Sequence, residues 1–229
     1  MAVTADTLRR VKALRNTVGT DIDATVRGLA KAWTREWAVL SPRWQAATAE
    51  VLALQAGLDR WPSPWQLARA ERVQRALQAT EQSLALLAAT SSTAVTATAL
   101  TAIDTTTEQA PAVVASQLPP PAIAAATAAI AGLVTAQAVD ADRARTRRHI
   151  ARQLAALAAV TSDAIRRALI RPRSGSISAE VMSDAVADAF NTGLGHAITA
   201  ARTEPVDAYR AAARTVHLAN SATVSGWSW

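Results

Sequence analysis

Apolar side chains recur at every third or fourth position along the first forty residues. The ten positions are Leu8, Val11, Leu14, Val18, Ile22, Val26, Leu29, Trp33, Trp37 and Leu40. Their mean spacing is about 3.6 residues, the period of an α-helix, so they fall on one helix face. Gly19 lies inside this run and predicts either a weak point or a break, with Thr20 or Asp21 recapping the helix.

Prolines divide the pattern that follows. Ser41-Pro42 has the form of an N-cap followed by proline in the first turn, which predicts a second helix from this point. Trp61-Pro62-Ser63-Pro64-Trp65 predicts a turn, in which Ser63-Pro64 starts a third helix. Because no Gly or Pro occurs between Trp65 and Ala110, this helix is expected to span about 45 residues. Its threonines are poor helix formers, so fraying or a break is expected near Ser91.

The clearest predicted boundary lies at Pro111 and the run Leu118-Pro119-Pro120-Pro121. Helical spacing resumes after it as far as a linker at 171–176. A helix to Phe190, a joint at Asn191-Thr192-Gly193 and two helices at about 194–203 and 205–219 complete the chain. No stretch alternates as a strand would. The prediction is an all-α fold, an elongated bundle or hairpin of long helices with a smaller C-terminal helical domain. The predicted parts are a long-helix domain (1–110), a proline-rich linker (111–121), an arginine-rich helical segment (122–173) and a C-terminal domain (174–229).

Charge is concentrated in one segment. The chain has 24 Lys and Arg against 18 Asp and Glu, a net charge of +6, and only Lys12 and Lys31 are lysines. Nine arginines and three aspartates lie between Asp140 and Arg173, so this segment carries the whole excess. Arginines on a helix bind phosphates or acidic protein surfaces, although a solvated helix face is the commoner role. The candidate contacts to a protein partner or DNA are Arg143, Arg145, Arg147, Arg148, Arg152, Arg166 and Arg167. No aromatic residue is interleaved with them, which disfavours single-strand stacking.

Five of the seven tryptophans fall between Trp33 and Trp65. They are expected to pack in the core around a proline turn, and a recognition surface is the alternative. Two uncharged stretches, 82–103 and 122–139, approach the length of a membrane span. The first is rich in Ser and Thr and the second in Ala, so closely packed soluble helices are the favoured interpretation.

The residues give no support for catalysis. The chain has no cysteine, and neither a glycine-rich phosphate loop nor a G-x-S-x-G nucleophile motif is present. His149, His196 and His217 are far apart and lack a second ligand at metal-binding spacing. No catalytic residue, metal site or cofactor is therefore predicted, and the protein is expected not to be an enzyme. The charged N-terminus contains no secretory signal.

The C-terminal residues carry the most specific motif. Arg202-Thr203-Glu204 is followed by Tyr209-Arg210 and then by Gly226-Trp227-Ser228-Trp229. This arrangement resembles the phage Mu F-like minor head proteins, also called phage head morphogenesis proteins, over about residues 175–229. Residues 202, 203, 204, 209, 210, 226, 227 and 229 are its expected structural positions. An ion pair involving Arg202, Glu204 and Arg210 is expected to fix the helix against a following strand, with Gly226 allowing close approach.

The resemblance implies a minor capsid protein of a tailed bacteriophage. Such a protein is made in the host cytoplasm, docks on the portal protein inside the procapsid and is in some cases ejected with the DNA. Members of this family normally continue beyond the last Trp with a cysteine-containing segment, whereas this sequence stops at Trp229, so a short product or a fragment is expected. Two alternatives are a basic helical nucleic-acid-binding accessory protein and the delivery half of a larger enzyme or toxin fusion.

Overall fold

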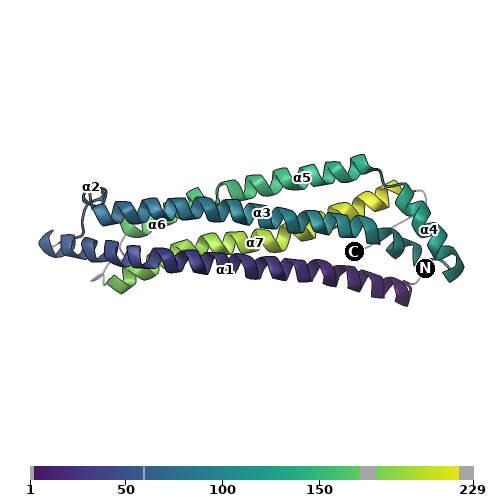
Figure 1. The fold of residues 1–229 in the computed structure, drawn as a ribbon, viewed down its shortest axis with the longest axis horizontal. Helices are drawn as coiled ribbons and strands as arrows, with labels where there is room; N and C mark the ends of the chain where they lie inside the picture. Colours follow the sequence, from purple (N-terminus) through teal and green to yellow (C-terminus); the bar gives the residue numbers. More distant parts are fainter. Residues whose placement is uncertain (1–2, 59, 171–178, 222–229) are drawn as a thin grey trace. The chain divides into compact units, whose positions relative to one another are not determined.

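The computed structural model describes residues 3–58, 60–170 and 179–221, and these residues confirm the all-α prediction. No strand occurs among them. The helices, labelled in Figure 1, are α1 (Ala5–Leu58), α2 (Pro64–Leu67), α3 (Glu71–Ala115), α4 (Pro120–Gly132), α5 (Ala136–Ala155), α6 (Leu157–Ile170) and α7 (Ala179–Ala219).

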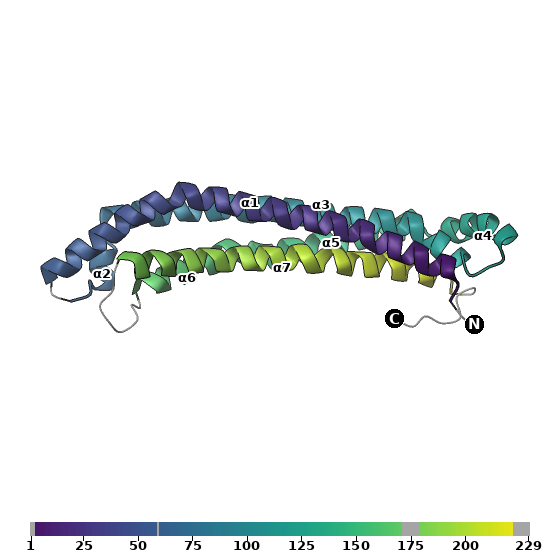
Figure 2. The ribbon, with the colours of Figure 1, turned by 90° about the horizontal axis from the view of Figure 1, so that it is seen from below.

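The helices contribute to two compact units, each assembled from separate stretches of chain. Unit 1 comprises the described parts of Met1–Val26, Thr93–Arg152 and Ala200–Trp229, and unit 2 comprises those of Arg27–Ser92 and Gln153–Thr199. Thus α1, α3 and α7 each contribute one stretch to unit 1 and another stretch to unit 2. These three helices are labelled in Figure 2. This division differs from the four consecutive segments predicted from the sequence.

Small side chains dominate the core of unit 1. One cluster joins Ala110 and Ala115 of α3 to Ile130 of α4 and Val216 of α7. A second cluster joins Val18, Ile22 and Ala102, and the partly buried Tyr209 packs against it. Buried hydroxyls supplement these contacts, since the Oγ1 of Thr7 and the Oγ of Ser116 lie 2.6 Å apart.

The core of unit 2 contains the large side chains. Trp33 and Trp44 are both 1% exposed. The Trp33 ring lies 4.9 Å from the ring of Phe190, and Trp37 lies 5.2 Å from the same ring. The Nε1 of Trp44 donates a hydrogen bond of 3.0 Å to the Oγ1 of Thr80. The expected core packing is therefore confirmed for Trp33 and Trp44.

The expectation is wrong for Trp65, which is 62% exposed. This residue lies in the single turn of α2, where the Arg69 guanidinium lies 4.0 Å from its ring centroid. Ser63 and Gln66 form a reciprocal capping box, so a helix does start at Ser63 as predicted. This helix, α2, ends after four residues, so the predicted long helix begins at Glu71 rather than at Ser63.

Three of the helix boundaries predicted at proline are wrong. Pro42, Pro111 and Pro205 lie inside α1, α3 and α7, so no second helix begins at Ser41. A proline inside a helix costs about 3 kcal/mol or more through a lost hydrogen bond and a steric clash. Burial on both sides of Pro42 offsets this cost, since Leu40 and Trp44 are each only 1% exposed.

The predicted joint at 191–193 is also wrong, because α7 continues through it. Gly193 is in this helix for packing, since a Cβ there would lie 2.5 Å from the Oγ1 of Thr161 and 2.6 Å from the Cη2 of Trp33. The expected weak points at Gly19 and Ser91 are likewise helical. In contrast, the breaks at 133–135 and at Ala156 were not predicted.

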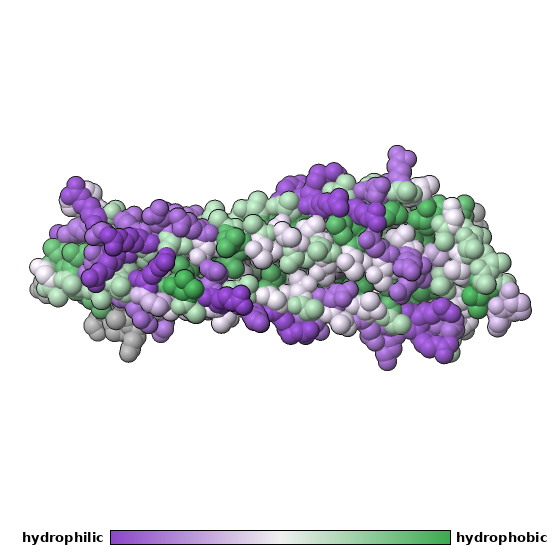
Figure 3. All heavy atoms as spheres, viewed as in Figure 1, coloured by the Kyte–Doolittle hydropathy of each residue, from purple (hydrophilic) through white to green (hydrophobic). Residues whose placement is uncertain are grey.

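Membrane-crossing potential is limited within the described residues. By length and composition, α3 alone is long and apolar enough to cross a membrane, and a second candidate arises only if α4 and the helical stretch after it count as one broken span. A buried core helix passes the same test, and Val95, Ala99 and Ile103 of α3 are fully buried. Hydrophilic groups interrupt the apolar surface on the face shown in Figure 3.

Candidate functional site

Three of the seven candidate arginines form ion pairs within the protein, namely Arg143, Arg166 and Arg145, whose contact with Asp142 is described with the pocket below. Arg143 of α5 contacts Asp104 of α3 at 2.7 Å and Asp140 at 2.9 Å, and these hydrogen bonds raise the pKa of its guanidinium. Arg166 of α6 contacts Glu81 of α3. Arg143 therefore links two helices of unit 1, and Arg166 links two helices of unit 2.

The four candidate arginines that form no ion pair are exposed. Arg147, Arg148 and Arg152 lie on α5 in unit 1, and Arg167 lies on α6 in unit 2. Among the described residues no ion pair involves them, and the Nε of Arg152 donates a hydrogen bond to the carbonyl of Arg148. These four arginines are therefore the part of the predicted set that is available to a partner, and three of them lie together on α5.

A buried carboxylate joins α5 to α7. Asp142 is 5% exposed. Its Oδ2 accepts a hydrogen bond of 2.5 Å from the Oγ1 of Thr215, and its Oδ1 lies 3.3 Å from the Nη1 of Arg145. Both carboxylate oxygens therefore have polar partners, as a buried charge requires. The contact holds the guanidinium group of Arg145 beside Asp142, whose other oxygen is bonded to α7.

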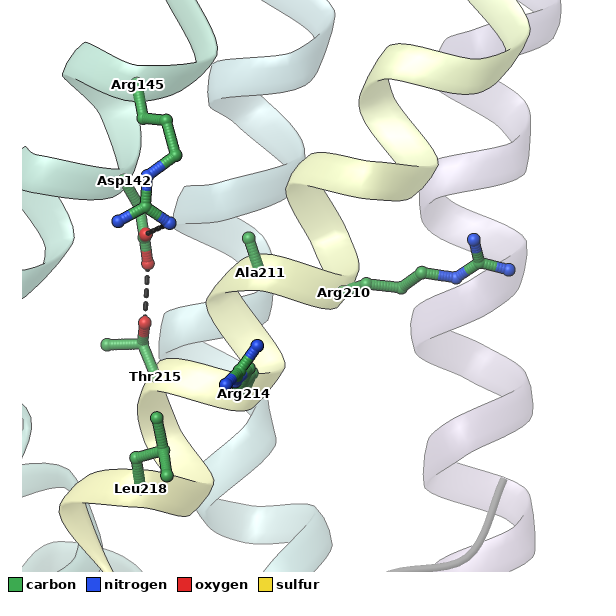
Figure 4. A pocket seen from close by; sticks show the side chains of 7 residues that line it. All are labelled: Asp142, Arg145, Arg210, Ala211, Arg214, Thr215 and Leu218. Carbon is green, nitrogen blue, oxygen red and sulfur yellow. Dashed lines mark hydrogen bonds and ion pairs between the residues drawn. The ribbon is translucent and has the colours of Figure 1, made fainter.

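A pocket of about 460 Å³ opens beside this contact. Its lining consists of Asp142, Arg145, Arg210, Ala211, Arg214, Thr215 and Leu218. In Figure 4, Arg145 extends from α5 toward Asp142, while Arg210 and Arg214 project from successive turns of α7. Three arginines and one aspartate give the lining a formal charge of +2. Two helices of unit 1 contribute this lining, but the Arg210 side chain points away from Asp142 and Arg145, so the three guanidinium groups do not converge on one point.

Sequence reasoning identified Arg145 as a partner contact and Arg210 as a structural motif residue, but it missed Arg214 and Thr215. Asp142 pairs with Thr215 and His149 pairs with Glu204, so rising numbers on α5 meet falling numbers on α7. The helices are therefore antiparallel in this unit. A single sequence contains no information on which residues of α5 face which residues of α7, because the contacting residues are more than 50 positions apart. The pocket could therefore not be predicted.

The family-motif residues have different environments. Glu204 is 4% exposed, and its Oε1 lies 3.4 Å from the Nε2 of His149 on α5. The expected ion pair with an arginine of its own helix is wrong, since Arg210 instead contacts Asp207 at 3.2 Å. Arg202 and Thr203 are exposed and Tyr209 is half-buried. Gly226, Trp227 and Trp229 lie outside the described residues.

The carboxyl of Glu204 has a raised pKa. Burial is the largest cause, the charge of Asp207 adds to it, and His149 opposes it through its charge and its hydrogen bond. Burial also lowers the pKa of His217. Among the described residues no group of three or more His, Asp and Glu side chains is arranged to hold a metal ion. His149 and Glu204 form a pair that links two helices.

Comparisons with models of protein families, with curated proteins and with solved structures find no match to this chain.

Proposed function

We propose that this protein is a structural minor head protein of a tailed bacteriophage that docks on the portal protein inside the procapsid. The observation that carries the proposal is the Arg202-Thr203-Glu204 and Tyr209-Arg210 motif with its resemblance to the Mu F-like family. The environments of Glu204 and Tyr209 support a structural role for this motif. Glu204 is buried against α5, and Tyr209 packs on the cluster of Val18 and Ile22.

The exposed arginines of α5 are the proposed contact with the portal. Arg147, Arg148 and Arg152 project from one helix and have no ion pair among the described residues. Guanidinium groups bind carboxylates through bidentate hydrogen bonds as well as through charge, so an acidic portal surface is a suitable partner. Exposed pairs of this kind steer association and set specificity more than they add affinity.

Co-sedimentation with purified portal rings tests the proposal. The wild-type protein is expected to pellet with the rings, and the triple variant Arg147→Glu, Arg148→Glu, Arg152→Glu is expected to remain in the supernatant. The matched control reverses three exposed arginines of α1, Arg15, Arg27 and Arg35, and is expected to bind the rings. An equal loss of ring binding in both variants would mean that binding depends only on the net charge of the protein, which would contradict the α5 contact. No binding of the wild type to the rings would refute the proposal.

A basic nucleic-acid-binding accessory protein is the second candidate function, because the pocket on α5 and α7 concentrates positive charge. It predicts binding to DNA without binding to portals. The same sedimentation experiment at two salt concentrations, with duplex DNA in place of the rings, separates the two functions.

A further inference from the structure

We infer that a groove on the α1 and α3 stretches of unit 2 binds an acidic α-helix of a partner protein. The groove has a volume of about 500 Å³, and all of its lining residues belong to unit 2. It shares no residue with the α5 arginines or with the pocket on α5 and α7. The inference is therefore independent of the proposed function, and it assigns a binding role to arginines outside the arginine-rich segment.

Two contacts fix how α1 and α3 run past each other at this groove. The Nε1 of Trp44 donates to the Oγ1 of Thr80, and the Oε2 of Glu50 accepts from the backbone N–H of Arg72 at 2.8 Å. Rising numbers on α1 thus meet falling numbers on α3, so the two stretches are antiparallel (Figure 1). Arg43 precedes Trp44 and therefore lies at the opposite end of the groove from Arg72.

The charged side chains that line the groove are all positive. They are Arg43, Arg72 and Arg75, so the described lining has a formal charge of +3. Among the described residues no ion pair involves Arg43 or Arg72. Arg75 pairs with Glu71, but both side chains are more than 70% exposed, so it can exchange this partner at low cost. The nearby Glu50 carboxylate is turned to backbone N–H groups at the start of α3, which leaves the groove in need of negative charge.

The spacing of these charges fits an extended ligand. Since Trp44 lies opposite Thr80, Arg43 is level with about residue 81 of α3, nine residues from Arg72 or roughly 14 Å along the helix axis. A single small anion cannot bridge that distance. Carboxylates three or four residues apart on one helix lie on the same face, so a helix of three turns presents them at both ends of the groove.

The apolar part of the lining favours close contact with a helix. Ala76 and Ala79 form the floor and are 0% and 7% exposed, and Ala46 of α1 lies beside them. Alanine side chains are short, so the ridge of a partner helix can enter between α1 and α3. An amphipathic helix would bury its apolar face on this floor while its acidic residues pair with the arginines.

The same lining disfavours two other occupants. A DNA backbone gains little from a floor of buried methyl groups, because its contacts are made through phosphates. A second copy of this chain carries a net charge of +6 and would be repelled by the groove. Gln78 and Gln82 at the rim offer acceptors as well as donors, so they can bond the mixed polar side chains of a protein. Charge complementarity therefore assigns the groove to an acidic protein helix.

Fluorescence anisotropy with a labelled synthetic peptide tests the inference on the full chain. The peptide is alanine-rich, about 20 residues long so that it is helical in isolation, and has glutamates on one face. A second peptide with glutamine at those positions is expected not to bind. The groove variant replaces all three groove arginines with Gln, and the matched control replaces three exposed arginines outside the groove with Gln, namely Arg15, Arg27 and Arg214.

The groove variant is expected to bind the glutamate peptide about tenfold more weakly than the wild type does, since each exposed ion pair changes an equilibrium constant about two- to threefold. The control is expected to bind as the wild type does. A second pair of variants tests the shape of the groove without changing charge. Ala46→Leu fills the groove and is expected to weaken binding, whereas Ala13→Leu on an exposed position of unit 1 is expected to leave it unchanged. Circular dichroism melts check that all variants fold.

Four results would overturn the inference. These are an equal loss of affinity in the two arginine variants, equal binding of the two peptides, unchanged affinity in Ala46→Leu, and tighter binding of a labelled DNA duplex with the same dependence on the groove arginines. Portal co-sedimentation separates this inference from the proposed function, because the groove variant is expected to pellet with the rings.

Discussion

Gly193 of α7 offers a sharp test of the packing in unit 2. In the interior of a helix, replacing Gly with Ala normally stabilises by about 1 kcal/mol. At Gly193 the added Cβ would lie 2.5 Å from the Oγ1 of Thr161 and 2.6 Å from the Cη2 of Trp33. Favourable contact between heavy atoms begins at about 3.5 Å, so both neighbours would have to move by close to 1 Å.

These neighbours have little freedom to move. Trp33 and Thr161 are each 1% exposed, and the Trp33 ring is packed against Phe190 at 4.9 Å. Overpacking a core of this kind costs about 1 to 3 kcal/mol, and the rigid indole places Gly193→Ala at the upper end. After subtraction of the helix-propensity gain, the expected net loss is about 1 to 2 kcal/mol.

Gly195 provides the control, because a Cβ there would have no neighbour within 4 Å. Gly195→Ala is expected to stabilise by up to about 1 kcal/mol. In a chain of this length 1 kcal/mol shifts Tm by about 2–4 °C, so thermal melts should move in opposite directions for the two variants. Adding Trp33→Phe should recover part of the loss at Gly193, since the smaller ring opens space. A Gly193→Ala variant as stable as Gly195→Ala would refute the packing argument.

Three further predictions concern polar contacts. The pKa of Glu204 is higher in the folded state than in the unfolded chain, so the folded state binds this proton more tightly. Protonation of Glu204 therefore stabilises the fold at pH values below the pKa of the unfolded chain, and this stabilisation is lost as the pH rises through the pKa of the folded state. Glu204→Gln, which keeps an oxygen acceptor for His149, should therefore lose stability relative to the wild type as pH is lowered from 7 to 4 in a series of melts, and a constant difference would contradict this. Thr80→Val leaves the buried indole N–H of Trp44 without its acceptor and should cost about 1 to 3 kcal/mol in urea unfolding, whereas an unchanged midpoint would exclude the bond. Glu50→Ala removes the carboxylate that accepts from two backbone N–H groups at the start of α3, and the loss in Tm should correspond to about 0.5 to 2 kcal/mol, with Glu50→Gln intermediate.

Periodicity was sufficient to predict the fold class and which stretches are helical, but not where most of the helices begin and end. The apolar positions between Leu8 and Leu40 lie on α1, and the capping signal at Ser63 marks a true helix start. The stripe predicted buried residues correctly in part, since Leu14, Leu29 and Leu40 are 1–2% exposed whereas Leu8 is 61% exposed. These features are local, so one sequence contains the information that sets them.

The prolines gave wrong helix boundaries because the free-energy cost of a proline arises within its own helix, whereas the packing contacts that offset this cost come from elsewhere in the fold. Pro111 and Pro205 are themselves buried, and the turns around them bury Val113, Ala115 and Ala208. Contacts of this kind come from other helices, which the sequence does not place. Gly193 was misinterpreted for the same reason, because its neighbours Trp33 and Thr161 are remote in sequence. The candidate site depends still more on such contacts, since His149 and Glu204 are 55 residues apart.

The two units differ in how they are stabilised. Of the twelve largest fully buried side chains, nine belong to unit 2, namely Trp33, Leu40, Trp44, Val51, Val73, Leu84, Ile165, Val186 and Phe190. Unit 1 contributes only Val95, Ile103 and Ile150. Each large apolar side chain contributes about 1.5 to 3 kcal/mol on burial, so the described residues of unit 2 have the larger hydrophobic contribution.

Unit 1 is therefore expected to open first. Its helix contacts include buried polar pairs, Asp142 with Thr215 and Glu204 with His149, whose net contribution to stability is small compared with apolar burial. Hydrogen exchange in low concentrations of denaturant should show protection lost in the unit 1 stretches of α1, α3 and α7 before the unit 2 stretches of the same helices. The internal prolines alone would not give the same gradient in all three helices, because Pro42 lies in the unit 2 stretch of α1 whereas Pro111 and Pro205 lie in the unit 1 stretches of α3 and α7. Uniform protection along α1 would instead mean that the two units unfold as one.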